Sequence, residues 1–352
     1  MKIALITDTH WGIRGDAIAF HDYFKQSVHE FFLPELRNRG IKKIIHLGDL
    51  VDRRKFVNFL TAHRLRKDFL DPVESEFEMD IIVGNHDTYY KNTNDLNALR
   101  ELVVGRYNNI KVFTNATTVY DNDIPILYVP WICADNHDHT FNAIQNTEAQ
   151  ICFGHLELSG FELYRGHVSE HGFNHTIFDR FDVVCSGHYH HKSSSGNINY
   201  LGAFAEFTWV DYDDPRGFHV FDTETRQLEF VRNPFNMFVK LYYDDSNKTI
   251  EQVVPETIDV KNKIVKVVVR NKTNPYWFDL FIDKVETSSP LELQVIEDNL
   301  QLDIENEDIF DEAEDTITIF KNYIGQLNLE GVKRDKLEQT IVELYQEAIA
   351  IA

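Results

Sequence analysis

Val83-Gly84-Asn85-His86-Asp87 is the stretch that decides the fold of this 352-residue chain. It closes the segment 80–83, whose last three residues are apolar, which is typical of a short buried strand. Polar side chains begin where that strand is expected to end, and the glycine permits a tight turn there. The stretch therefore predicts a strand that delivers amide and imidazole groups to the edge of a sheet.

The same arrangement recurs at four other places in the chain. A strand-like apolar run precedes each of Asp8-x-His10, Gly48-Asp49-x-x-Asp52-Arg53, Gly154-His155 and Gly187-His188-x-His190. In open α/β sheets, ligand sites collect just beyond the carboxyl ends of the strands. We therefore expect these five segments to converge on one site.

Strand-like and helix-like segments alternate along the first 235 or so residues. Apolar runs predict strands at residues 2–7, 43–47, 80–83, 126–129, 150–153 and 181–185, and helical periodicity predicts helices at 22–39, 56–70 and 96–103. Shorter strands are expected at 197–201, 217–221 and 227–231. This alternation favours the α/β class, with a sheet covered by helices.

The C-terminal third has a different organisation, of the α+β kind. A polar stretch at 244–262 is typical of a linker, and a strand at 263–269, a helix at 277–285 and a strand at 292–296 form a small βαβ-like unit. Two amphipathic helices are expected after it, with apolar faces made by Ile317, Phe320, Ile324 and Leu327, and by Leu337, Ile341, Leu344, Ala348 and Ile351. The predicted domains are 1–240, 258–304 and 305–352.

Composition and charge restrict the possible functions. Apolar residues make up 43% of the chain, no run reaches the roughly 18 apolar residues of a membrane helix, and the first apolar stretch is too short for a signal peptide. Cys133, Cys152 and Cys185 form no CxxC pair and are expected to be buried thiols in a reducing compartment, so we expect a cytoplasmic protein without a membrane. The net charge is −22, and residues 286–315 contain twelve Asp or Glu and no Lys or Arg. Any contact with nucleic acid should then be local, metal-assisted or shared with a partner.

The five segments contain the chemistry of a divalent metal site. Seven side chains offer carboxylate, imidazole or amide donors: Asp8, His10, Asp49, Asn85, His155, His188 and His190. In an extended backbone, Asp-x-His and His-x-His each place two donors on the same side. Seven donors are too many for one ion that keeps an open position, but they fit two ions that share Asp49. Two ions about 3.5–4 Å apart can clamp the attacking and leaving oxygens of a phosphoryl transfer.

This ordered set of segments resembles the calcineurin-like metallophosphoesterase superfamily over about residues 1–235. Within it the chain is similar to the SbcD-type double-strand-break repair nucleases, and most of all to the nuclease subunits of tailed-phage recombination endonucleases. Further matching segments are Pro130-Trp131, Gly154-His155-Leu156-Glu157-Leu158, Ser186-Gly187-His188-Tyr189-His190 and Asp214-Pro215-Arg216-Gly217-Phe218. The resemblance implies a two-sheet β-sandwich flanked by helices (1–240), a small capping domain (258–304) and C-terminal helices for partner docking (305–352).

The resemblance also implies roles for the site residues. One ion would be held by Asp8, His10, Asp49 and His190, and the other by Asp49, Asn85, His155 and His188. Mn²⁺ is the expected ion, with Mg²⁺, Zn²⁺ or Fe²⁺ as alternatives, because four imidazoles make an all-oxygen magnesium site unsuitable. His86 would be the general acid or transition-state donor, and Asp52 would orient it and favour its protonated form. Part of the nuclease family has a second histidine where Asp52 stands. Asp87 is expected to support the turn.

Substrate contacts rest on fewer residues. Arg53 could contact a phosphate or be a solvated arginine at the start of a helix. Tyr89, Tyr90, Trp131 and Tyr189 could stack on unpaired bases or pack around the site. The other histidines, including His137, His139, His167, His171, His175 and His191, are expected to be loop or surface groups.

Partners are also implied by the resemblance. The C-terminal helices would dock on the coiled-coil base of an SbcC-type, SMC-like ATPase, with packing against the chain's own domain as the alternative. A homodimer would form through the helices after the second and third segments, with candidate contacts at Phe56, Val57, Phe59, Leu60, Leu96, Leu99, Leu102 and Val103. DNA, single- or double-stranded and at its ends, is the expected substrate.

Three functions are compatible with these observations. The first is a metal-dependent DNA exonuclease with endonuclease activity, working with an ATPase in recombination and end processing. The second is a phosphomonoesterase or protein phosphatase, but Asp87 stands where protein phosphatases commonly have glutamate. The third is a catalytically silent DNA-end-binding subunit, against which the full set of candidate ligands and His86 argues.

Overall fold

Two six-stranded sheets form the larger part of the structure, a computed structural model that describes residues 1–297 and Lys336. The first sheet has the order β14-β13-β1-β2-β3-β4. Its strands are β1 Lys2–Ile6, β2 Lys43–His46, β3 Glu78–Ile82, β4 Ile110–Phe113, β13 Gly217–Asp222 and β14 Leu228–Arg232. Strands β1 to β4 are mutually parallel, and β13 runs antiparallel to β1.

The second sheet has the order β11-β12-β10-β7-β6-β5. Its strands are β5 Thr117–Asp121, β6 Ile124–Val129, β7 Ile151–His155, β10 Val183–Gly187, β11 Ser193–Ser195 and β12 Ile198–Tyr200. A small hairpin, β8 Glu162–Tyr164 and β9 His167–Val168, lies between β7 and β10 in sequence. The expectation of a two-sheet sandwich is therefore confirmed, and the sequence pattern alone missed β4 and β5.

The core lies between the two sheets. Ile3, Leu5 and Ile45 from the first sheet pack with Ile151 and Phe153 from the second, and all are at most 1% exposed. Alternate residues of a strand point to opposite faces, so the intervening side chains of β7 and β10 join a second cluster with helix α7, His137–Asn146. Cys152 and Cys185 are buried free thiols, one in each of these clusters, and Cys133 is buried as well, as expected.

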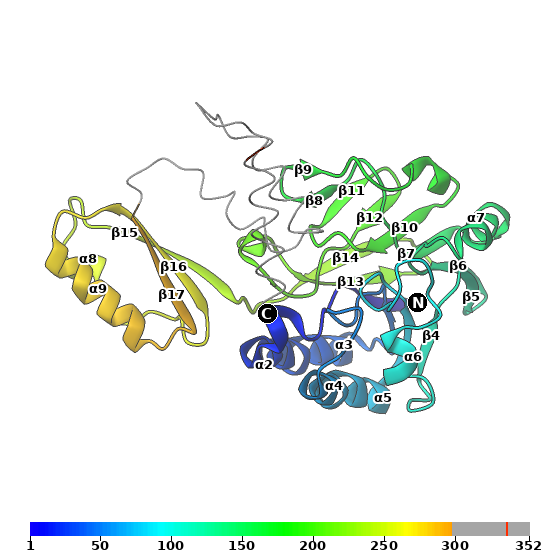
Figure 1. Ribbon diagram of the computed structural model, residues 1–352, viewed down its shortest axis with the longest axis horizontal. Coiled ribbons are helices and arrows are strands. Elements are labelled where there is room, and N and C mark those ends of the chain that lie inside the picture. The colour runs from blue at the N-terminus through cyan, green and yellow to red at the C-terminus, as the bar shows by residue number, and fades with distance from the viewer. Residues whose placement is uncertain (298–335, 337–352) are drawn as a thin grey trace. The chain divides into compact units, whose positions relative to one another are not determined.

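Six short helices precede the second sheet in sequence, and those labelled α2 to α6 lie together on one side of the sandwich (Figure 1). They are α1 Ile13–Asp16, α2 Ile18–Gln26, α3 Leu33–Arg39, α4 Phe59–Leu65, α5 Asp71–Glu76 and α6 Ala98–Leu102. Wide π-helical turns, Ser27–Phe32 and Arg66–Leu70, join α2 to α3 and α4 to α5. The helix expected at 22–39 thus begins at Ile18. The one expected at 56–70 begins at Phe59, because Asn58 caps it by accepting a 2.9 Å hydrogen bond from the Leu60 amide, and it continues to Glu76.

A three-stranded sheet with two helices follows the sandwich in sequence. Its order is β15-β16-β17, made of Phe238–Asp244, Ile264–Asn271 and Glu292–Glu297. Helix α9, Pro275–Thr287, packs Phe278, Phe281 and Val285 on this sheet with Val265 and Val267. The strand–helix–strand unit expected here is present.

The prediction of a linker at 244–262 is wrong. Helix α8, Ile250–Val253, lies within it, and Val253 and Val260 are buried in the small core. The sheet also includes β15, a strand that the sequence pattern missed and that pairs in parallel with β16. The two C-terminal helices expected beyond residue 317, and the acidic stretch beyond residue 297, lie outside the described residues. Among the described helices, none is long and apolar enough to cross a membrane.

Candidate metal centre

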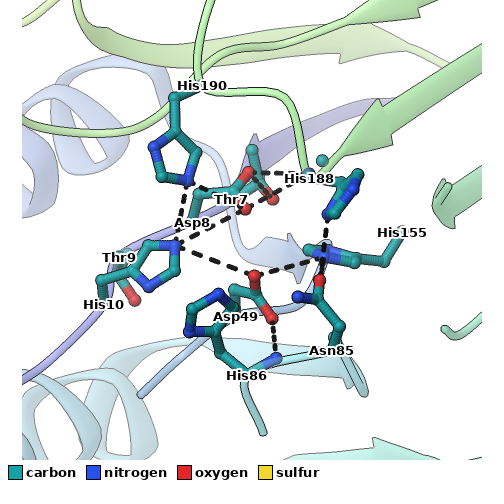
Figure 2. A network of polar contacts seen from close by, with 12 residues as sticks. Thr7, Asp8, Thr9, His10, Asp49, Asn85, His86, His155, His188 and His190 are labelled. Atoms are coloured by element: carbon teal, nitrogen blue, oxygen red, sulfur yellow. Dashed lines mark hydrogen bonds and ion pairs between the residues drawn. The ribbon is translucent and has the colours of Figure 1, made fainter. Parts of the chain in front are cut away.

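All seven predicted donors come together at the carboxyl ends of five strands (Figure 2). Asp8 and His10 follow β1, Asp49 follows β2, and Asn85 follows β3, all in the first sheet. His155 ends β7, while His188 and His190 follow β10, both in the second sheet. The site therefore lies where the ends of the two sheets meet, which explains why each segment follows an apolar run.

The first group of donors is Asp8, His10 and His190, whose ligand atoms lie within 4.8 Å of one another. The Nε2 atoms of His10 and His190 are 3.1 Å apart, and His10 Nε2 is 3.9 Å from Asp8 Oδ1. Asp8 is fully buried and accepts a 2.7 Å hydrogen bond from the Thr7 hydroxyl. These contacts orient its carboxylate toward the imidazoles.

The second group is Asp49, His155 and His188, again with ligand atoms within 4.8 Å. Asp49 Oδ2 is 3.3 Å from His155 Nε2, and Asn85 Oδ1 is 2.9 Å from both His155 Nε2 and His188 Nδ1. Asp49 Oδ2 is also 3.8 Å from His10 Nε2 in the first group. Asp49 therefore lies between the two groups, the place that a bridging carboxylate would take.

The donor set fits divalent metal ions. Lone-pair donors, namely imidazole nitrogens, carboxylates and one amide oxygen, point at one another at distances that suit atoms gathered around an ion. Imidazole and carboxylate together are typical ligands of borderline ions such as Mn²⁺, Fe²⁺ and Zn²⁺. Bound there, two such ions would supply Lewis acidity and a nucleophilic water.

The side chains of the two groups shift one another's pKa values. Burial disfavours the charged form of His155, but the Asp49 carboxylate outweighs this and raises the pKa of His155 to about 9. Burial, followed by the neighbouring His155, holds the pKa of His188 well below its usual range. The Asp49 pKa is lowered well below its usual value because His155 and His86 outweigh the effect of burial. Asp49 is thus ionised at neutral pH and available as a ligand.

At four of the seven donors the backbone is left-handed and not extended, which corrects the expectation of alternating side chains in Asp-x-His and His-x-His. Asp8, His10, Asp49 and His188 have φ values of 48°, 42°, 55° and 90°. Such left-handed conformations are uncommon for non-glycine residues and cluster at functional sites. Hydrogen bonds between the two loops hold them, from the Asp8 amide to the Gly48 carbonyl at 3.1 Å and from the His10 amide to the Asp49 carbonyl at 3.1 Å.

Asp87 holds the second and third loops together. Its buried carboxylate accepts hydrogen bonds of 2.9–3.2 Å from the amides of Asp49, Leu50, Val51 and Gly84. Burial, followed by the charge of Asp49, raises the pKa of Asp87 to about 7, while these amides oppose the shift. Asp87 therefore supports the turn, as expected. Gly48 is needed beside it, since its φ is +97° and a Cβ there would lie 2.6 Å from His155 Nδ1.

Asp52 differs from its expected role. The Nδ1 of His86 lies 2.5 Å from the backbone carbonyl of Asp52, and the Asp52 carboxylate instead lies 3.6 Å from His10 Nδ1. Burial lowers the pKa of His86, but Asp49 and, after it, the carbonyl and the charge of Asp52 raise it, so Asp52 does favour the protonated form, as expected, without outweighing burial. The Asp52 carbonyl accepts a hydrogen bond from Nδ1–H of His86, so Nε2 is the ring nitrogen of His86 that is left for another partner. The ring centroid of His86 is 4.8 Å from that of His10.

The aromatic residues near the site divide into two kinds. Tyr189 is 2% exposed, donates a 3.0 Å hydrogen bond to the Leu158 carbonyl and stacks on Tyr200, so of the two roles considered for it the structure supports packing and not contact with substrate. Tyr89 and Tyr90 are 37% and 52% exposed and contact each other edge to face. Trp131 lies beside the site, with its ring centroid 5.1 Å from that of His188.

Arg53, the other candidate for a substrate contact, forms a 3.0 Å ion pair with Asp16.

A buried network behind His190 was missed by sequence reasoning. The Arg216 guanidinium donates to the His190 carbonyl and pairs with Asp211 and Asp214. His191 Nδ1 lies 2.7 Å from Asp214 Oδ2, so His191 is not a plain surface group. The available signal is the segment Asp214-Pro215-Arg216-Gly217, which matches the family pattern but carries no spacing that connects it to the site.

Comparisons with known proteins agree with this geometry. A family model described as calcineurin-like phosphoesterase matches residues 1–192. The "Exonuclease subunit 1" of Enterobacteria phage T4 is 31% identical over 354 residues, covering 99% of both chains. The SbcD component of the SbcCD nuclease of Staphylococcus epidermidis is 26% identical over 225 residues, covering 57% of this chain and 56% of that protein.

Among solved structures, a "Novel Archaeal Phosphodiesterase" matches with 14% identity and a TM-score of 0.32, over 66% of this chain and 99% of that one, a likeness too weak to carry an argument. The family model spans more than half of the chain and includes all the donors, from Asp8 to His190. On this match and the full-length similarity to the phage protein, the chain belongs to the calcineurin-like phosphoesterase family.

Proposed function

We propose that this protein is a metal-dependent DNA nuclease that hydrolyses phosphodiester bonds with two divalent ions. The observation that carries the proposal is Asp49, whose carboxylate lies 3.3 Å from His155 and 3.8 Å from His10 and so connects two groups of metal donors. A nuclease rather than another phosphoesterase is supported by the names of the two relatives, one an exonuclease subunit and the other part of a nuclease.

The proposed ligands are those expected from the sequence. Asp8, His10, Asp49 and His190 hold one ion, and Asp49, Asn85, His155 and His188 hold the other, with Mn²⁺ as the favoured ion. Two dications and the two aspartates leave the site positive, which suits a phosphodiester although the chain as a whole carries −22. His86 donates a hydrogen bond or a proton to the leaving oxygen, and Asp52 fixes its ring through the backbone carbonyl.

The proposed partners are DNA, a second copy of this chain and an SbcC-type ATPase. The relatives named as subunits support assembly with another protein. Exposed apolar side chains after the second segment, Phe56, Phe59 and Leu60, support a homodimer contact, whereas Leu99 and Val103 are buried and take no part in it. The segment 305–352 is proposed to dock on the ATPase, and the complex to act in the cytoplasm, in recombination and end processing.

The test uses the full chain with Mn²⁺ against labelled linear duplex DNA and against p-nitrophenyl phosphate. We expect the unmodified protein to degrade DNA and Asp49→Asn to lose this activity, because removal of the bridging charge weakens the binding of both ions. Arg64→Gln, which changes a charged residue on α4, is the matched control and should retain activity.

Other outcomes would change the assignment. Strong monoester turnover with intact DNA would overturn the nuclease proposal in favour of a phosphomonoesterase. If neither substrate reacts, the assay is repeated with an SbcC-type ATPase and ATP. DNA binding without cleavage under those conditions would identify a catalytically silent end-binding subunit.

A further inference from the structure

The loop that follows His10 has an unusual backbone. Gly12, Arg14, Gly15 and Asp16 have φ values of 101°, 54°, 69° and 64°. Arg14 and Asp16 are not glycines, and the left-handed region costs such residues free energy. Strained residues of this kind persist only where the surrounding structure holds them, and they cluster at functional sites. The loop follows directly after His10, a proposed metal ligand.

Contacts on the Asp16 side of the loop hold a second arginine in place. The Thr61 hydroxyl donates a 2.6 Å hydrogen bond to Asp16 Oδ1, and Asp16 Oδ2 pairs with Arg53 Nη1 at 3.0 Å. A Cβ on Gly15 would lie 3.8 Å from Arg53 Nη2, so the Arg53 guanidinium lies against the backbone next to Arg14. The left-handed turn therefore places Arg53 beside Gly15, the residue that follows Arg14, although the two arginines come from different segments.

The Arg14 side chain is fixed at the edge of the metal centre. Its Nε donates a 3.0 Å hydrogen bond to the carbonyl of Phe207. The Phe207 ring centroid is 5.3 Å from that of His10 and 5.4 Å from that of His190, two proposed ligands of the first ion. Arg14 is nevertheless exposed. Its guanidinium thus lies at the solvent-facing rim, on the side of His10 and His190.

The two arginines differ in exposure. Arg53 is half-buried and lies 3.0 Å from the Asp16 carboxylate and 3.9 Å from that of Asp52, which balance part of its charge. Arg14 is the more exposed of the two, and its side chain contacts the carbonyl of Phe207, whose ring lies beside His10 and His190. A polynucleotide that approaches the ions from solvent therefore meets Arg14 first, with Arg53 behind it, and a guanidinium is well suited to bind phosphate oxygens.

We propose that Arg14, assisted by Arg53, binds a backbone phosphate next to the one at the metal ions. A polynucleotide offers such a neighbouring phosphate, and a phosphomonoester does not. The pair would thus help this site to select nucleic acid over small phosphate esters. This inference rests on the proposed function, because it names how that same site recognises its substrate.

The test compares Arg14→Gln, Arg14→Lys, Arg53→Gln and the control Arg64→Gln, whose arginine pairs with Asp22 on α2 and with Asp68 one turn further along its own helical segment. Each full-length variant is assayed with Mn²⁺ on duplex DNA and on bis-p-nitrophenyl phosphate, a diester without a second phosphate. For Arg14→Gln we expect the DNA-to-diester ratio of kcat/KM to fall about ten-fold or more, mainly through KM, since it removes a charge-assisted hydrogen bond. Arg53→Gln should lower the ratio less, Arg14→Lys should restore part of it, and Arg64→Gln should not change it.

A binding measurement separates this inference from the proposed function. In a His86→Gln background, the affinity for a fluorescent oligonucleotide is measured by anisotropy at several salt concentrations. Loss of one phosphate contact should reduce the slope of log Kd against log salt by about 1. An unchanged slope and DNA-to-diester ratio in Arg14→Gln, or an equal fall on both substrates, would overturn the assignment. Absence of DNA cleavage by the unmodified protein, with intact salt-dependent binding through Arg14, would instead refute the nuclease activity alone.

Discussion

His86 is the residue on which the proposed hydrolysis depends most after the metal ligands. Its backbone amide donates a 2.8 Å hydrogen bond to Asp49 Oδ1, and its Nδ1 is fixed by the Asp52 carbonyl. We expect His86→Gln to lower kcat on DNA by about 10²- to 10⁴-fold, as is typical for loss of a proton donor, with Mn²⁺ content retained. On bis-p-nitrophenyl phosphate the loss should be smaller, because nitrophenolate leaves without protonation.

The exposed His137→Gln is the matched control for this experiment, since His137 contacts groups away from the centre, such as Asp138 and Phe141. Metal content is measured on both variants. Equal losses on the two substrates, or loss of bound Mn²⁺, would show that His86 acts as a ligand or a structural group and not as a donor to the leaving oxygen.

The identities of the donors could be predicted because each one follows a recognisable buried strand. Their backbone conformations could not, since the spacing of Asp8 and His10 suits an extended chain as well as the left-handed turn that is present. For the same reason the contact between Asp52 and His86 was predicted, but the group of Asp52 that makes it was not. A short spacing brings a residue near His86 without deciding whether its carboxylate or its carbonyl makes the contact.

At the scale of elements, Glu206 ties the start of β15 to the segment that precedes β13. Its buried Oε2 accepts hydrogen bonds from the amides of Met237 at 2.7 Å and Phe238 at 3.0 Å. Burial raises the pKa of Glu206 to about 7, while those two amides oppose the shift. Asp211, which raises it further, and Arg216, which lowers it, are the nearest other charges, together with Lys263.

This raised pKa predicts a pH-dependent stability. The folded state holds the Glu206 proton up to about pH 7, and the unfolded chain releases it near pH 4.5. The folded state therefore binds more protons in this window, so the contribution is present below pH 4.5 and is lost as the pH rises through 7, by up to about 3 kcal/mol. Glu206→Gln keeps an acceptor for both amides and removes the titration. Urea unfolding at pH 5 and pH 8 should show a smaller pH difference in the variant, and an equal difference would contradict the assignment.

Elements with strong periodicity were predictable and their ends were not. The helix at Pro275–Thr287 and the strand at Glu292–Glu297 were found from pattern alone. Strand β15 was missed because Lys240 interrupts its apolar run, although Val239, Leu241 and Tyr243 alternate toward the small core. Polar residues at 244–262 suggested a linker, yet Val253 and Val260 in that stretch are buried.

At the scale of the whole molecule, charge and assembly are connected. The chain carries −22, so a nuclease built from it needs local positive groups, such as the proposed ions and Arg14, or a partner that supplies affinity for DNA. Docking of residues 305–352 on an ATPase stays a prediction, because this segment, apart from Lys336, lies outside the described residues. Self-association, by contrast, can be predicted from side chains in the described part of the chain.

The exposed apolar surface at the start of α4 predicts a homodimer. Phe59 is 94% exposed, Phe56 61% and Leu60 40%. A cluster of large exposed apolar side chains such as this is typical of a surface that binds another protein. We expect the full chain to have twice the monomer mass in sedimentation equilibrium and Phe59→Glu to reduce it to one. Val168→Glu, at a side chain 55% exposed on β9, adds the same charge elsewhere and should remain dimeric. Because Phe59 contributes almost nothing to the core, the variant should keep the far-ultraviolet circular dichroism spectrum of the control. A monomeric unmodified protein, or a dimer that survives Phe59→Glu, would place the interface elsewhere.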